Sequence, residues 1–140
     1  MKTMTPQSGI EARSLKVLVV DDVLDNRIFA TWMLTHLGHT VAEAENGQEA
    51  VDMMHRSAYD MVLMDIQMPK MDGLEAALCA SKMAGGKPPI VACTALDNPD
   101  IRKKAKEVGM CGFITKPINV VTLRALIERV GRGGSLVMCA

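Results

Sequence analysis

The sequence predicts a doubly wound α/β domain in which five parallel strands alternate with five helices. Five short apolar runs, each with the length of a buried strand, are separated by segments with helical periodicity or helix-capping residues. Strict alternation of this kind is typical of a parallel sheet with helices on both faces. Because each crossover is right-handed, the carboxyl ends of all the strands are expected to lie at the same edge of the sheet.

The first predicted strand is rich in β-branched residues. Residues 16–20, KVLVV, form this run, which ends at Asp21 and Asp22. Residues 25–37 are predicted to form a helix that Gly38 ends. One face of this helix is expected to be apolar and to consist of Ile28, Phe29, Trp32, Met33 and Leu37.

The second predicted strand is more polar than the apolar part of the first. It covers residues 40–44 and contains Glu43, which suits a strand at the edge of a sheet. A helix then begins after Asn46, which is predicted to cap it while Glu49 completes a capping box. The buried side of this helix is expected to include Ala50, Met53 and Met54.

The third apolar run, residues 61–64, has the sequence MVLM and ends at Asp65. Met68 and Pro69 interrupt regular structure soon afterwards. Asp72 followed by Glu75 three residues later predicts the start of a helix over residues 73–84.

Two further strand and helix pairs complete the pattern. Residues 90–93 and 112–115 are the predicted strands, and they end at Thr94 and Lys116. The helix between them is predicted to be capped by Asn98, with a proline in its first position, and the last helix by Asn119. The inner faces are expected to be formed by Ile101, Ala105 and Val108 in the fourth helix and by Val120, Leu123, Ile127 and Val130 in the fifth.

Length and composition indicate a single small domain. The chain has 140 residues and a formal net charge of zero, which gives no global electrostatic reason for binding nucleic acid or an anionic membrane. We expect flexible tails over residues 1–14 and 132–140 around a domain over 15–131. No apolar run is long enough to cross a bilayer and no signal peptide is present, so a cytoplasmic location is expected.

The four cysteines lack metal-ligand or CxxC spacing. Neither a metal framework nor a disulfide framework is therefore expected from them. The first three, Cys79, Cys93 and Cys111, are predicted to be buried free thiols.

Polar residues follow four of the five predicted strands. They are Asp21 and Asp22, Asp65, Thr94 and Lys116. In the flavodoxin-like strand order 2-1-3-4-5, the strands that carry them are contiguous, so all five residues are expected to meet at one edge. The second strand contributes none, in keeping with an edge position.

The chemistry of these side chains suits phosphoryl transfer to a carboxylate. Three crowded carboxylates repel unless a cation neutralises them, and oxygen ligands suit Mg²⁺. Lys116 supplies a positive charge for a phosphoryl oxygen or for Asp65, and the hydroxyl of Thr94 can donate a hydrogen bond to such an oxygen. Asp65 is then the candidate nucleophile.

Four stretches resemble the CheY-like receiver domain of two-component response regulators. They are VLVVDD (17–22), DMVLMDIQMPKMDGLEA (60–76), PIVACTA (89–95) and GFITKP (112–117). The resemblance covers nearly the whole chain. It implies a phosphorelay domain that is phosphorylated on Asp65 by a phosphohistidine donor, either a histidine kinase or a histidine phosphotransfer protein, and that catalyses only its own phosphorylation and dephosphorylation.

The resemblance also implies roles for individual residues. Asp22, Asp65 and the backbone carbonyl of Gln67 would bind Mg²⁺ directly, and Asp21 would bind it through water. Thr94 and Lys116 would contact the phosphoryl group, and the Lys116–Pro117 peptide bond would be cis. Phe113 matches the aromatic switch position, whose movement would alter a partner-binding face made by the fourth helix, fifth strand and fifth helix. Gln67 and Leu96 stand where the family varies the lifetime of the phosphoryl group.

Other classes of function fit the sequence less well. An aspartyl-nucleophile phosphatase of the haloacid-dehalogenase type would need an acid two residues after Asp65, where Gln67 stands. A flavodoxin-like cofactor binder would need a glycine-rich loop after the first strand, where Asp21 and Asp22 would repel phosphate. A degenerate receiver that only docks partners has no support, because all the acidic and basic positions are present. Two contexts stay open: a free-standing regulator, and a receiver module excised from a hybrid histidine kinase.

Overall fold

Five parallel strands form the central sheet of the computed structural model, in which residues 14–68, 71–83 and 88–131 are described. The strand order is β2-β1-β3-β4-β5, as the sequence predicts. The strands are β1 (Lys16–Val20), β2 (Thr40–Ala44), β3 (Met61–Asp65), β4 (Ile90–Thr94) and β5 (Gly112–Thr115). Apart from Ser14, the two predicted tails lie outside the described residues.

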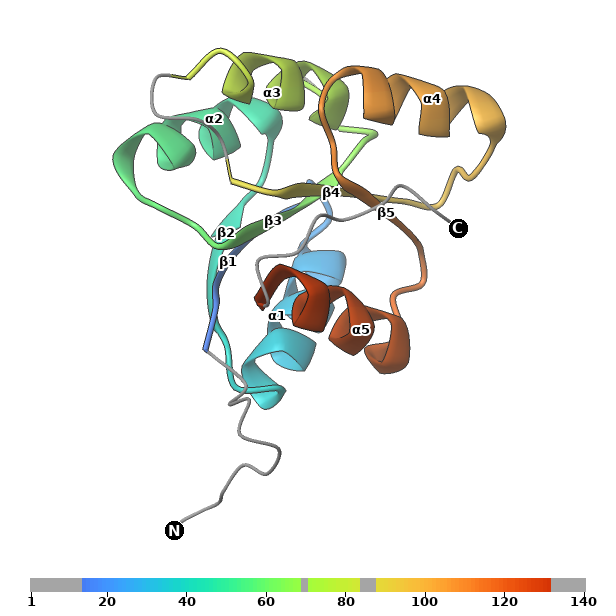
Figure 1. The fold of residues 1–140 in the computed structure, drawn as a ribbon. Helices are drawn as coiled ribbons and strands as arrows, with labels where there is room; N and C mark the ends of the chain where they lie inside the picture. Colours follow the sequence, from blue (N-terminus) through green and yellow to red (C-terminus); the bar gives the residue numbers. More distant parts are fainter. Residues whose placement is uncertain (1–13, 69–70, 84–87, 132–140) are drawn as a thin grey trace, which may run out of the picture.

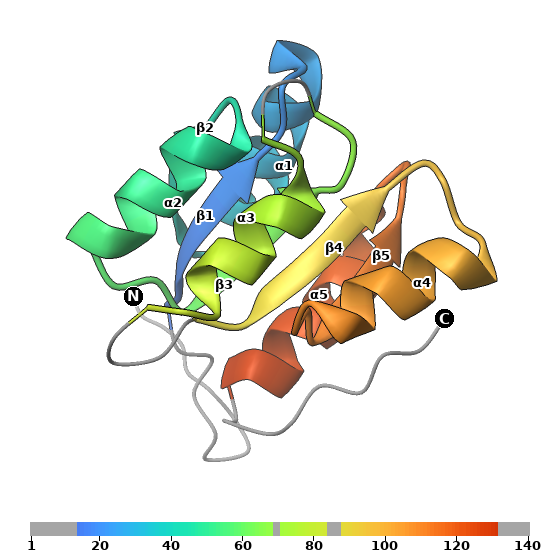
Figure 2. The same ribbon diagram turned by 90° about the horizontal axis from the view of Figure 1, so that it is seen from above.

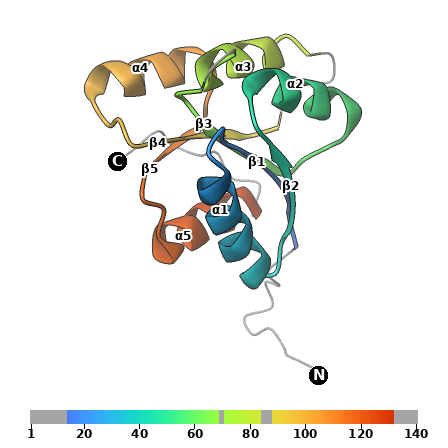
Figure 3. The same cartoon turned by 180° about the vertical axis from the view of Figure 1, so that it is seen from behind.

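Helices cover both faces of the sheet. Figure 1 shows α2 (Gly47–Arg56), α3 (Gly73–Ala80) and α4 (Pro99–Glu107) on one face, and α1 (Leu24–His36) and α5 (Val120–Gly131) on the other. The view from behind in Figure 3 shows the same division. Each layer of helices encloses its own apolar cluster against the sheet. No helix of the described residues is both long and apolar enough to span a bilayer.

The helix caps largely follow the sequence signals. Asp72 and Glu75 form a complete capping box at the start of α3, and the Asn46 side chain accepts a hydrogen bond from the Glu49 backbone N–H. The predicted box at Asn46 is wrong in its second half, because the Glu49 carboxylate accepts from the backbone N–H of Glu45. The caps of α4 and α5 are Asn98 and Asn119.

The predicted buried face of α1 is correct for Met33, which is buried, and for Leu37, which is partly buried, but wrong for the other three residues. Ile28, Phe29 and Trp32 are 54%, 49% and 61% exposed. The side chains that α1 buries are Ala30, Met33 and Leu34. Apolar residues occur nearly all round this helix, so helical periodicity alone does not select one face. The stripe that packs on the sheet is selected by tertiary contacts with the apolar cluster on that face.

The prediction of three buried thiols is also wrong in one case. Cys93 is buried in β4 and Cys111 is partly buried, but Cys79 is exposed. The buried side of α3 consists of glycine and alanine only, namely Gly73, Ala76, Ala77 and Ala80. Cys79 lies one position before the last of these and therefore points outward.

Gly73 fixes the approach of α3 to the end of β3. A Cβ built on this glycine would lie 2.2 Å from the backbone oxygen of Asp65 and 3.0 Å from Ile66 Cα. The Gly73 backbone N–H donates to the Ile66 carbonyl at 3.0 Å. Since the obstructing atoms are backbone, a side chain at this position would move either α3 or the strand end that carries Asp65.

We therefore expect Gly73→Ala to destabilise the domain, although alanine favours helix more than glycine does. Overpacking against backbone should lower the free energy of unfolding by about 1–3 kcal/mol, measured by urea denaturation. Leu78→Ala, on the exposed side of the same helix, is the control and should change it by less than about 0.5 kcal/mol. Equal stability of Gly73→Ala and the unsubstituted chain would contradict the close contact.

Candidate functional site

The parallel registers bring the ends of four strands together. Val20 of β1 pairs with Met64 of β3, and Asp65 pairs with Cys93 of β4. The backbone N–H of Lys116, directly after β5, donates to the Thr94 carbonyl at 2.9 Å. The view from above in Figure 2 shows β1, β3, β4 and β5 side by side and running in one direction. The candidate residues that follow these strands consequently share one edge of the sheet.

Three carboxylates form a cluster at this edge. Carboxylate oxygens of Asp21, Asp22 and Asp65 all lie within 4.8 Å of one another. Asp21 and Asp65 are 5% and 6% exposed, whereas Asp22 is exposed. A set of hard oxygen donors with one member open to solvent matches the preference of Mg²⁺, which binds through a few carboxylates and keeps several waters. The donor set therefore fits the predicted metal.

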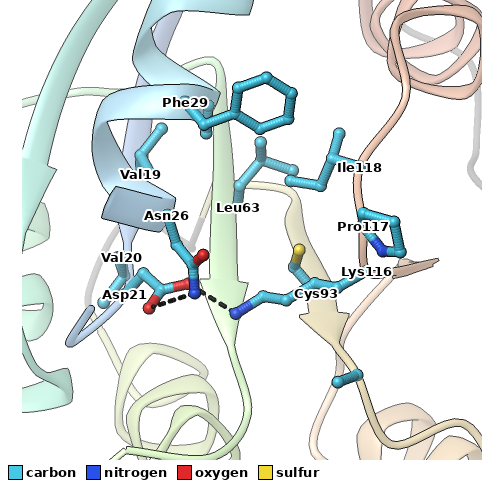
Figure 4. A pocket seen from close by; sticks show the side chains of 12 residues that line it. Val19, Val20, Asp21, Asn26, Phe29, Leu63, Cys93, Lys116, Pro117 and Ile118 are labelled. Carbon is cyan, nitrogen blue, oxygen red and sulfur yellow. Dashed lines mark hydrogen bonds and ion pairs between the residues drawn. The ribbon is translucent and has the colours of Figure 1, made fainter. Parts of the chain in front are cut away.

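The Lys116 ammonium neutralises part of this cluster. Its Nζ lies 2.6 Å from Asp21 Oδ2 and 3.4 Å from Asp65 Oδ2. Figure 4 shows the Lys116 side chain extending from beside Pro117 toward Asp21. Burial acts to lower the pKa of Lys116, but the hydrogen bond to Asp21 and the nearby Asp65 raise it above its ordinary value. Lys116 therefore stays charged. Its ammonium lies closer to the carboxylate of Asp21 than to that of Asp65, the candidate nucleophile.

Asp65 has an unusual acidity for an aspartate. Burial raises its pKa to about 6, and the Asp21 carboxylate adds to this effect while the Lys116 ammonium opposes it. The backbone N–H of Gln67 donates to Asp65 Oδ1 at 3.2 Å. A carboxylate with a raised pKa and few hydrogen bonds is more basic than a solvated one, which suits a nucleophile once a cation is bound beside it.

The two predicted switch residues lie on neighbouring strands. Thr94 is fully buried, and its hydroxyl accepts from the Leu96 backbone N–H at 3.1 Å. Phe113 is 7% exposed, and the Arg102 guanidinium stacks over its ring at 4.3 Å from the centroid. The Lys116–Pro117 peptide bond is cis.

Two residues of α1 position the acidic cluster although no sequence motif marked them. The Asp21 carboxylate accepts from the Val23 backbone N–H at 2.9 Å and from Asn26 Nδ2 at 3.4 Å. Arg27 donates to the Asp21 carbonyl at 2.8 Å and also forms an ion pair with Glu43 of β2 at 3.2 Å. Glu43, the charged residue that predicted an edge position for β2, is thus linked through Arg27 to the loop that carries Asp21.

An apolar cavity of about 270 Å³ adjoins the Lys116–Asp21 ion pair. Figure 4 shows Phe29 of α1 across from Ile118 and Pro117, with Leu63 and Cys93 between the two sides. Burial raises the pKa of the Cys93 thiol to about 12, so this cysteine is neutral and a poor nucleophile. The cavity thus has apolar walls and the charged atoms of Asp21 and Lys116 at one end.

A doubly wound sheet with carboxylates and a lysine at its strand ends defines a receiver-type signalling domain. The family described as the response regulator receiver domain matches residues 17–128, and the chain belongs to this family. Hybrid signal transduction histidine kinase I of Dictyostelium discoideum is 37% identical over 129 residues, which cover 86% of this chain and 7% of the relative. The sensor protein ArcB of Escherichia coli is 36% identical over 118 residues, which cover 83% of this chain and 15% of ArcB.

Solved structures agree with this assignment. The chemotaxis response regulator CheY4 of Vibrio cholerae is 30% identical, with a TM-score of 0.78 and coverage of 84% of this chain and 99% of that chain. The receiver domain of sensor histidine kinase PA1611 from Pseudomonas aeruginosa is 29% identical, with a TM-score of 0.79 and coverage of 86% and 99%. That structure holds a magnesium ion in its active-site cleft.

The raised pKa of Asp65 predicts a pH-dependent effect of Asp65→Asn on stability. The folded chain holds the Asp65 proton more tightly than the unfolded chain, so stability falls as the pH rises from about 4 to about 6. Above that range the ionised side chain destabilises the metal-free fold. Asp65→Asn should therefore raise the free energy of unfolding at pH 7.5 by on the order of 2 kcal/mol, and change it little near pH 4.

Denaturation in the presence of a metal chelator measures this effect. Asp22→Asn is the comparison, because it removes a charge from the exposed member of the cluster and should stabilise the fold much less. An equal gain at both pH values would show that the Asp65 carboxylate is not destabilised by burial.

The close contact between Lys116 and Asp21 predicts competition with a metal ion. Lys116→Ala removes a cation from the carboxylates, so we expect Mg²⁺ to bind several-fold more tightly, as measured by isothermal titration calorimetry. Lys104→Ala removes the same charge from an exposed position on α4 and controls for long-range electrostatics. Weaker binding by Lys116→Ala than by this control would refute the competition.

Proposed function

We propose that this domain accepts a phosphoryl group from a phosphohistidine donor onto Asp65, with Mg²⁺ bound at the acidic cluster. The observation that carries this proposal is the position of the Asp65 carboxylate, which lies at the end of β3 within reach of two further carboxylates and the Lys116 ammonium. A nucleophile, a metal-ligand set and a fixed cation are the parts that phosphoryl transfer to a carboxylate needs.

In the proposed reaction, a carboxylate oxygen of Asp65 forms a bond to phosphorus as the bond from phosphorus to the donor imidazole nitrogen breaks. The electron pair of that bond goes to the imidazole, which leaves as neutral histidine after taking up a proton. Bound Mg²⁺ would neutralise the negative charge shared by the carboxylates and the phosphoryl oxygens. Lys116 would then pair with a phosphoryl oxygen instead of with Asp21, and the Thr94 hydroxyl would leave Leu96 and donate to another.

The metal ligands proposed from the sequence are Asp22, Asp65 and the Gln67 carbonyl, with Asp21 acting through water. The short distances between the carboxylates support the first part of this set. Asp21 is already engaged by Lys116, Val23 and Asn26, and such an engaged carboxylate suits an indirect role.

The proposed signal is a shift of the face formed by α4, β5 and α5, through Thr94 and Phe113. A downstream protein would bind this face, and the donor would be a histidine kinase or a histidine phosphotransfer protein. We place the domain, over residues 15–131, in the cytoplasm, without binding to nucleic acid or membrane. A receiver module within a hybrid histidine kinase is compatible with the same site, and the identity of 37% to part of a hybrid histidine kinase supports that context.

Phosphate incorporation tests the proposal directly. Asp65→Asn should abolish acid-labile labelling by a small acyl phosphate in the presence of Mg²⁺, because the amide lacks a nucleophilic oxygen. Asp25→Asn, an exposed substitution in the first turn of α1, is the control and should label normally. Mass spectrometry of the labelled chain locates the group, and undiminished labelling of Asp65→Asn would place the acceptor elsewhere.

A further inference from the structure

Charged side chains are distributed unevenly around α4. Arg102 stacks on Phe113 of β5, so the flank of α4 that carries Arg102 borders β5. Successive helical residues are rotated by about 100°, which places Lys106 on the same flank as Arg102. The other charged residues of α4 lie on its solvent-facing side or its opposite flank and are Asp100, Lys103, Lys104 and Glu107. Both acidic residues of α4 are thus directed away from β5, and its β5-facing flank is cationic.

The same separation occurs in α5. Leu126 packs beside β5, since its Cδ1 atom lies 3.5 Å from the position of a Cβ built on Gly112. Arg129 follows three residues later on the same flank and is exposed, whereas Arg124 and Glu128 lie on the far side of the helix. Figure 1 shows α4 and α5 on opposite sides of β5 at one edge of the sheet. We call this edge the cationic face and define it by Arg102, Lys106, Thr115, Leu126 and Arg129.

One carboxylate of this chain already occupies part of the cationic face. Asp97, in the loop before α4, accepts from Arg102 Nε at 2.7 Å and from a terminal nitrogen of the same guanidinium at 3.1 Å. The Thr115 hydroxyl donates to the same carboxylate at 3.2 Å. The hydrogen bonds from Arg102 hold the pKa of Asp97 below its usual range. The face therefore binds a carboxylate in two-pronged geometry within its own structure.

We propose that the cationic face binds an acidic peptide segment of the downstream partner, whose carboxylates pair with Lys106 and Arg129 and whose apolar side chains contact Leu126. This inference rests on the proposed function, because it assigns a chemistry to the partner of the same signalling face. Recognition of acidic motifs by clustered basic side chains is a general mode of peptide binding.

An acidic peptide fits the face better than nucleic acid does. Tight binding to a phosphate backbone at physiological salt needs more contacts than the three basic side chains of the cationic face supply. The net charge of the whole chain is zero, so the rest of the molecule adds no long-range attraction for a polyanion. Leu126 also gives the face an apolar surface, which a peptide side chain can cover and a phosphate backbone cannot.

The test uses a fluorescent peptide that combines glutamates with leucines, and a matched peptide with glutamines in place of the glutamates. Binding is measured by fluorescence anisotropy, before and after treatment of the full chain with a small acyl phosphate and Mg²⁺. The glutamate peptide should bind at least about tenfold more tightly than the glutamine peptide, with a difference that shrinks at high salt. A DNA duplex of random sequence should compete poorly.

Charge reversals locate the site on the molecule. Lys106→Glu and Arg129→Glu should each weaken binding of the glutamate peptide by about fivefold or more, because like charges then meet at the face. Lys104→Glu makes the same change on the opposite flank of α4 and should leave the affinity within about twofold. Equal losses in Lys104→Glu and Lys106→Glu, equal binding of the two peptides, no binding of the glutamate peptide, or stronger binding of the duplex would each overturn the inference.

Phosphate incorporation, measured on the same samples, separates this inference from the proposed function. Lys106→Glu and Arg129→Glu should label on Asp65 as the unsubstituted chain does, because neither residue lies at the acidic cluster. Normal labelling without selective peptide binding would reject the acidic partner and leave the phosphoacceptor role intact. Failure of the unsubstituted chain to label would reject the phosphoacceptor role itself.

Discussion

The structure depends on the cost of holding three carboxylates close together at the end of a sheet. Asp21 and Asp65 are almost fully buried, so solvent screens the repulsion between their carboxylates only weakly. Lys116 offsets this repulsion from a position far along the chain, which the parallel order β1-β3-β4-β5 makes possible. Because this cation is a lysine, a point charge on a flexible stem, it can move away from the carboxylates when another cation binds.

Local backbone contacts give the cluster its geometry. The absence of a side chain at Gly73 lets α3 begin against the Asp65 carbonyl, and the capping box of Asp72 and Glu75 fixes where that helix starts. On the other face of the sheet, Asn26 and Arg27 hold the loop of Asp21 from α1. The two layers of helices therefore converge on the same strand ends, and neither layer alone defines the site.

Most of the fold, and the grouping of the site, could be predicted because both depend on local sequence patterns. Strand ends, caps and right-handed crossovers follow from runs of apolar residues and from single residues such as Asp72. The inner face of α1 could not be predicted, since apolar residues surround that helix and only packing on the sheet chooses Ala30 over Phe29. The stacking of Arg102 on Phe113 likewise could not be predicted, because a contact between a helix and a strand elsewhere in the chain leaves no periodic pattern in the sequence.

Lys116 and Arg102 are each held in an ion pair with an aspartate of this chain. Lys116 is held by Asp21 at the acidic cluster, and Arg102 is held by Asp97 above Phe113. Each internal carboxylate keeps a cation in place and also competes with any anion that arrives from outside, because one contact must weaken as the other forms. In the proposed reaction, a phosphoryl group on Asp65 would pair with Lys116. In the proposed complex, an acidic segment would pair with Lys106 and Arg129 of the cationic face. The Thr115 hydroxyl donates to Asp97 and Thr115 directly precedes Lys116, so adjoining residues at the end of β5 contact the carboxylate beside Arg102 and the acidic cluster.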